Sequence, residues 1–157
     1  MISLIIVAAL IQTPEIPKAN PDDVKSEGAI IKSLYSVISG PAGEKRNWDR
    51  FRSLFSPKGS LAAVVKNRNG IIVSVSMTPE DYISRSGPYL EKNGFFERES
   101  KRKSMRSIDL VTVLSEYESR NKADDKKPFE TGTNSIQLFF DGSRWFIHSI
   151  LWQDKPK

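Results

Sequence analysis

The spacing of apolar residues changes over a long stretch near residue 93 of this 157-residue sequence. Before that point, outside residues 61–75, apolar residues recur three and four positions apart, which is typical of amphipathic helices. After it they alternate with polar residues, which is typical of strands. The first part predicts one helix that ends before Gly40, a second between Asn47 and Pro57, and a third that begins after Thr78.

The second part of the sequence predicts a meander of long strands. Asp141-Gly142 is a turn signal between the last two of them. A short hairpin is expected earlier, around an Asn-Gly turn at residues 69–70. Because helices and strands are segregated along most of the chain, we predict an α+β domain. The expected strands are 61–65 and 71–75 in the hairpin, then 96–107, 110–119, 135–140 and 145–152.

The composition predicts one globular domain and excludes several kinds of site. Hydrophobic residues make up 38% and charged residues 27% of the chain, as in ordinary single domains of this length. The sequence has no cysteine, and His148 is its one histidine. Thiol catalysis and the common zinc clusters are therefore excluded, and we predict neither a metal nor a cofactor.

The positive charge of the chain does not indicate a nucleic-acid partner. The net charge is +5, and a basic run lies between Arg98 and Arg106. Glu97 and Glu99 dilute this run, and no aromatic residue for base stacking is placed among its cations. We predict a solvated strand face and no nucleic acid, with a phosphate-binding patch as the alternative.

An apolar run, Ile2–Ile11, which only Ser3 interrupts, lies near the N-terminus and is followed by prolines. It is too short to span a bilayer, and its length suits the hydrophobic part of a signal peptide. No Lys or Arg precedes the run, so a buried strand or a membrane anchor remain alternatives. We expect a signal peptide over 1–12, an extended linker over 13–21 and the domain over 22–154. The protein is then periplasmic or secreted, with no stable membrane span.

The order of the expected elements resembles that of the nuclear transport factor 2-like, or SnoaL-like, superfamily. The segment TGTNSIQLFFDGSRWFIHSILW, residues 131–152, resembles its final hairpin, and NWDRFRSLFSPKGSL and MTPEDYISRSGPYL resemble its second and third helices. The resemblance implies three N-terminal helices packed in the concave face of a strongly curved, mostly antiparallel sheet. It further implies a pocket inside this cone and a homodimer formed through the sheet. The superfamily includes ketosteroid isomerase, scytalone dehydratase, limonene epoxide hydrolase and polyketide cyclases, alongside many members without catalysis.

Two of the long strands carry polar candidates for the pocket. Ser115 and Tyr117 share a strand face without charged residues. Tyr117 is therefore a candidate donor to a ligand, although an amphipathic tyrosine at the pocket mouth is the favoured interpretation. If Glu97 points inward, burial raises its pKa and makes it a candidate base. An exposed Glu97 opposite a cross-strand cation is the favoured interpretation. The full set of pocket candidates is Glu97, Ser115, Tyr117, Trp145 and His148.

The last strand is mostly apolar on both faces. Strict alternation places Trp145 and Ile147 on one face and His148 and Ile150 on the other. The neutral-range pKa of histidine makes His148 the default general acid or base. In the superfamily, however, the Trp-x-Ile face is the core side, which turns His148 away from the pocket. The opposite face, with Ile150, is then the expected dimer surface.

These observations predict a non-catalytic, exported domain that binds a small apolar or amphipathic ligand or another protein. The reason is that the sequence contains no mutually supporting nucleophile, base and orienting group. The alternative is a pocket enzyme, a lyase, isomerase or hydrolase, that uses Tyr117 with Glu97 or His148.

Overall fold

The computed structural model describes residues 16–156, so the expected signal peptide and the first part of the linker lie outside the described residues. The helices within this range are α1 (Pro21–Val24), α2 (Glu27–Ile38), α3 (Trp48–Leu54) and α4 (Pro79–Asn93). The strands are β1 (Phe55–Lys66), β2 (Ile72–Met77), β3 (Phe96–Ser107), β4 (Leu110–Arg120), β5 (Glu130–Phe140) and β6 (Trp145–Asp154).

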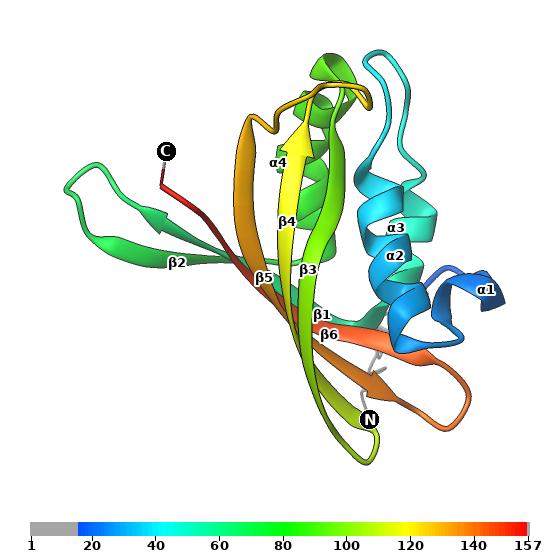
Figure 1. Cartoon of the computed structure of the whole chain (residues 1–157). Helices are drawn as coiled ribbons and strands as arrows, with labels where there is room; N and C mark the ends of the chain where they lie inside the picture. The colour runs from blue at the N-terminus through cyan, green and yellow to red at the C-terminus, as the bar shows by residue number, and fades with distance from the viewer. Residues whose placement is uncertain (1–15, 157) are drawn as a thin grey trace, which may run out of the picture.

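The strands form one sheet in the order β2-β1-β6-β5-β4-β3. Every neighbouring pair is antiparallel except β1 and β6, which run parallel. Figure 1 shows that the sheet is strongly curved and that α2, α3 and α4 lie on its concave side. The predicted α+β class with helices in the concave face of a mostly antiparallel sheet is confirmed.

The first expected helix is divided into α1 and α2, and Ser26 is the reason. Its backbone is extended, and its Oγ accepts a hydrogen bond from the backbone N–H of Ala29 at 3.1 Å. This N-cap starts α2 at Glu27. Later in the chain, Thr78 and Asp81 form a reciprocal capping box that starts α4. None of the helices within residues 16–156 has the length and apolar character needed to cross a membrane.

The core lies between α2 and the concave face of β4, β5 and β6. Each large aliphatic side chain that is fully buried there contributes roughly 1.5–3 kcal/mol, so this contact fixes α2 against the sheet. On the side of the sheet that α4 covers, the packing leaves an open volume, which forms the site described below. The fully buried aliphatic residues of this core include Ile30, Ile31, Val111, Val113, Ile136, Leu138 and Ile147.

A bulge in β6 decides which of its residues face the concave side. Ser149 pairs with Gln137 and Ile147 pairs with Leu138, so His148 has no partner of its own in β5. A residue inserted in this way reverses the alternation beyond it. Ile150 is therefore 5% exposed and faces inward. The expectation that Ile150 lies on an outer dimer surface is wrong.

Candidate ligand-binding site

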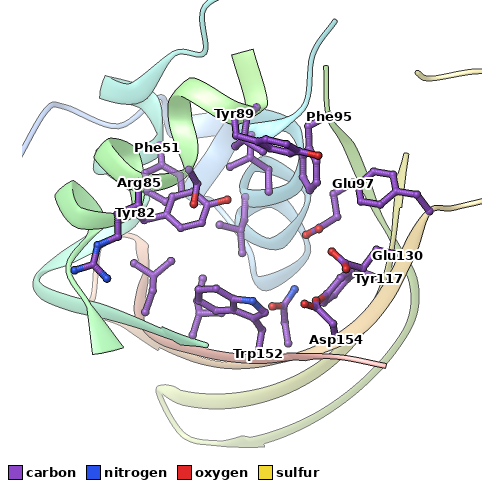
Figure 2. Close-up of a pocket in the computed structure, with 18 residues that line it drawn as sticks. Phe51, Tyr82, Arg85, Tyr89, Phe95, Glu97, Tyr117, Glu130, Trp152 and Asp154 are labelled. Atoms are coloured by element: carbon purple, nitrogen blue, oxygen red, sulfur yellow. The ribbon is translucent and has the colours of Figure 1, made fainter. Parts of the chain in front are cut away.

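A cavity of about 570 Å³ lies between α4 and the concave face of the sheet (Figure 2). Its volume is within the roughly 300–1,000 Å³ that is usual for small-molecule sites. The lining residues come from α2, α3, α4 and all strands except β2. The curvature of the sheet thus brings together side chains that are far apart in the sequence.

Aromatic rings form a large part of the cavity wall. Tyr82 of α4 stacks on Phe51 of α3, with ring centroids 5.3 Å apart, and meets Trp152 of β6 edge-on at 6.4 Å. Within the described residues no hydrogen-bond partner is found for the Tyr82 hydroxyl, and burial raises the pKa of this group. The wall therefore offers flat apolar surface to a ligand. Its aromatic members are Phe51, Tyr82, Tyr89, Phe95, Phe129 and Trp152.

Polar side chains gather at one end of the cavity. Figure 2 shows Glu97, Tyr117, Glu130 and Asp154 close together there, while Arg85 lies at the opposite side. The Tyr117 hydroxyl donates a hydrogen bond to Asp154 Oδ1 at 2.5 Å. Burial, this hydrogen bond and the nearby carboxylates hold the pKa of Tyr117 far above its ordinary value. Tyr117 is thus a protonated donor whose proton is engaged by Asp154.

Glu97 has a strongly raised pKa at this polar end. Its pKa is raised to about 7, mainly by burial; a hydrogen bond from Ser119 acts in the opposite direction, and the charges of Asp154 and Glu130 add to the effect of burial. That bond joins Ser119 Oγ to Glu97 Oε2 at 2.8 Å. Because Glu97 pairs in register with Ser119, its side chain faces inward. The favoured interpretation of an exposed Glu97 opposite a cation is therefore wrong.

Two other sequence candidates lie outside this cavity. Ser115 is buried behind it and shares hydrogen bonds with Tyr35 at 2.7 Å and with Glu99 at 2.6 Å. Trp145 is buried in the core, where its ring lies beneath the guanidinium of Arg106 at 5.1 Å. Both side chains support the fold around the site and do not line it.

His148 is exposed on the convex side of the sheet. Its ring lies edge-on to Phe139, with centroids 6.3 Å apart, and it does not line the cavity. The bulge at this position leaves Trp145 and Ile147 on the core side, as the resemblance implied. The structure therefore brings Glu97 and Tyr117 together but places His148 elsewhere.

Sequence reasoning missed two carboxylates of the polar end. Glu130 begins β5, before the expected start of that strand, and Asp154 ends β6, beyond its expected end. Sheet pairing places Gly132 opposite both Tyr117 and Asp154, and this juxtaposition has no signal in the sequence. Within residues 16–156 no group of three or more His, Cys, Asp or Glu side chains is arranged to hold a metal ion.

No protein-family model matches the chain, and no curated protein matches it significantly. Solved structures do match. A protein of unknown function with a cystatin-like fold from Nostoc punctiforme PCC 73102 aligns with a TM-score of 0.60 at 10% identity, over 82% of this chain and 87% of that one.

Two further matches carry the name of the fold. A nuclear transport factor 2-like protein from Cytophaga hutchinsonii ATCC 33406 aligns with a TM-score of 0.57 at 12% identity, over 83% of this chain and 99% of that one. A nuclear transport factor 2-like protein of unknown function from Silicibacter pomeroyi DSS-3 aligns with a TM-score of 0.54 at 12% identity, over 82% of this chain and 92% of that one. The chain therefore has the nuclear transport factor 2-like cone fold, which confirms the resemblance at the level of the fold. Identities this low carry no activity from one protein to another.

Proposed function

We propose that this protein binds a small, mainly apolar molecule in the cavity beneath α4. The observation that carries the proposal is the combination of an aromatic wall with a polar end inside a volume of about 570 Å³. Such a combination is typical of small-molecule sites, in which apolar walls supply affinity and a few polar groups fix the orientation.

A ligand-detected NMR screen of small aromatic and alicyclic compounds tests this function. Replacement of Trp152 by Ala removes part of the wall, so we expect the affinity of the compounds that bind to fall about tenfold. Gln153 is the matched control, since it is the neighbouring residue on β6 and its side chain is exposed. Gln153→Ala should leave the affinity unchanged. A screen without binders, or binding that is insensitive to Trp152→Ala, would refute the proposal.

Acid/base catalysis is the second candidate, and the pKa of about 7 of Glu97 is what favours it. A base with this pKa is half ionised near neutral pH, which suits proton transfer. The hydrogen bond from Tyr117 to Asp154 argues against it, because that hydroxyl has one proton to donate and Asp154 accepts it. Tyr117 thus cannot polarise a ligand carbonyl while the bond persists. We rank binding first for this reason.

The partner and the location of the protein are further parts of the proposal. Leu114 and Leu151 are 48% and 43% exposed and both flank Ser135 in the sheet, which favours a homodimer through the convex face. Analytical ultracentrifugation tests the dimer, and a concentration-independent monomer would exclude it. The apolar run Ile2–Ile11 favours export, and N-terminal sequencing of the mature protein tests that.

A further inference from the structure

The polar end of the cavity offers hydrogen-bond acceptors and almost no donors. The carboxylates of Glu97 and Asp154 are acceptors when ionised, and the proton of Tyr117 is already donated to Asp154. One N–H of the Asn134 side-chain amide is engaged as well, since it donates to the Tyr35 hydroxyl at 3.0 Å. A ligand group that supplies its own donors therefore complements this end best.

The charged residues at this end of the cavity are all acidic. Glu97, Glu130 and Asp154 line its polar end, and each of the last two raises the pKa of Glu97 through its negative charge. Arg85 is the cationic residue of the lining among the described residues, and Figure 2 shows it at the other side of the cavity. An anionic group placed at the polar end would meet repulsion, whereas a cation there would relieve it.

Aromatic rings adjoin this acidic end. Trp152 precedes Asp154 by two residues on the concave side of β6, and Phe95 lies two residues before Glu97. The faces of aromatic rings attract organic cations as well as apolar groups. The wall and the acidic end therefore select for the same kind of molecule, one with a positive head and an apolar body.

We propose that the ligand of this cavity is a protonated amine on an aromatic or alicyclic body, with the ammonium group held between Glu97 and Asp154. The body then lies against Tyr82 and Trp152. This inference rests on the proposed binding function and names the chemical class of its ligand.

The proposal predicts the sign of the pH dependence. A cation binds best to ionised Glu97, so the affinity for an amine should rise about tenfold between about pH 6 and about pH 8, as Glu97 ionises with its pKa of about 7. A primary alkylamine stays protonated throughout this range. Several charged or titratable groups interact electrostatically with Glu97: Tyr117 on β4, Glu130 on β5, Asp154 on β6, Tyr35 on α2 and Tyr82 on α4. Glu99 lies two residues further along β3, and Arg85 on α4 lies across the cavity.

Three probes with the same bicyclic body test the inference: naphthylmethylamine, naphthylmethanol and naphthoate. Isothermal titration calorimetry of the full chain at about pH 6 and about pH 8 should show the amine binding about tenfold or more tightly than the alcohol at the higher pH. Naphthoate should bind most weakly, and the affinity for the alcohol should not rise with pH.

Two variants distinguish the effect of Glu97 on amine binding from the effect of the overall charge of the protein. Glu97→Gln should weaken amine binding at about pH 8 by roughly 10- to 100-fold and remove its pH dependence. Glu116→Gln makes the same charge change on the exposed side of β4, where Glu116 pairs with Lys155, and should leave amine binding unchanged. Circular dichroism confirms that both variants are folded.

The results distinguish a failure of the amine inference from a failure of the proposed ligand-binding function. Tighter binding of the alcohol or the carboxylate than of the amine, or an amine affinity that Glu97→Gln does not lower, overturns the amine inference and leaves the ligand-binding function standing. If none of the three probes binds at millimolar concentration and the compound screen also yields no binder, both the inference and the proposed function fail.

Discussion

Glu97→Gln is expected to raise the free energy of unfolding by about 3 kcal/mol above pH 7. The reason is that the folded protein holds Glu97 with a pKa of about 7, against an ordinary value of 4.5, mainly because the carboxyl is buried. Each unit of difference corresponds to about 1.4 kcal/mol. A glutamine resembles the protonated form and avoids the cost of keeping a charge at this position.

The direction of the pH dependence follows from the raised pKa. Below about pH 4.5 Glu97 is protonated in the folded and the unfolded chain, and its favourable contribution is complete. Between pH 4.5 and 7 the unfolded chain ionises first, so the wild-type protein loses this contribution as the pH rises through the folded pKa. The difference in stability between Glu97→Gln and wild type should therefore grow over this window and be constant above it.

Urea denaturation of both proteins at several pH values measures this difference. Other groups contribute their own pH dependence. The hydrogen-bonded pair with Arg50 lowers the pKa of Asp23, so its contribution is lost as the pH falls. Subtraction of the wild-type curve cancels such terms. Glu116→Gln is again the control, and because Lys155 lowers the pKa of Glu116, its effect should have the opposite sign. A stability difference for Glu97→Gln that does not change with pH would contradict the prediction.

The negative charge of Glu97 affects both the stability of the protein and its proposed ligand binding. A carboxylate that costs stability at neutral pH is retained at the one end of the cavity where a cationic ligand would stabilise it. Proteins commonly accept such local costs at binding sites. Glu97→Gln should therefore be more stable than the wild type and a weaker binder of amines, a combination that a purely structural role for Glu97 would not produce.

The hydrophobic pattern was sufficient to predict the order of the elements and the fold. Alternation placed Val111, Val113, Ser115 and Tyr117 on one face of β4, and all four are buried on the concave side. The predictions that failed depended on register. Both faces of β6 are apolar in sequence, so the hydrophobic pattern could not predict the bulge at His148. This bulge turns Ile150 inward.

Residues of the candidate site could be predicted only where the pattern within a single strand shows which face points inward. Tyr117 was found because its neighbours on β4 share a face without charges. Asp154 and Glu130 were missed because they lie at strand ends and join the site only through pairing across β5 and β6. The pKa of Glu97 also depends on these two carboxylates and on burial, neither of which the sequence of β3 encodes.

Gly132→Ala is expected to lower the free energy of unfolding by about 4 kcal/mol and to disrupt the polar end of the cavity. Gly132 pairs with Tyr117 on one side and with Asp154 on the other, and the Tyr117 side chain crosses over it to reach Asp154. A methyl group at this position would overlap the Oη and Cζ atoms of Tyr117 and lie 2.7 Å from the backbone oxygen of Gln153. A glycine inside a strand often marks such a close approach.

The expected magnitude combines two effects. Overpacking in a well-packed region costs roughly 1–3 kcal/mol, and loss of a hydrogen bond to a charged group costs roughly 1.5–3 kcal/mol. Gly28→Ala is the control, because the nearest atom to its added methyl is Arg102 Nη1 at 3.9 Å and the position lies within α2. That variant should be stabilised by about 0.5–1 kcal/mol.

A double-mutant cycle with Tyr117→Ala identifies the cause, because removing the ring also removes the overlap. Once Tyr117 is alanine, adding Gly132→Ala should cost about 1 kcal/mol, so the two substitutions should be strongly non-additive in urea denaturation. The close approach of Gln153 accounts for the remaining cost, since its backbone oxygen stays in place. If the two destabilisations instead add, the Tyr117 ring is not what excludes a side chain at Gly132, and the account of how β5 holds Tyr117 against Asp154 fails.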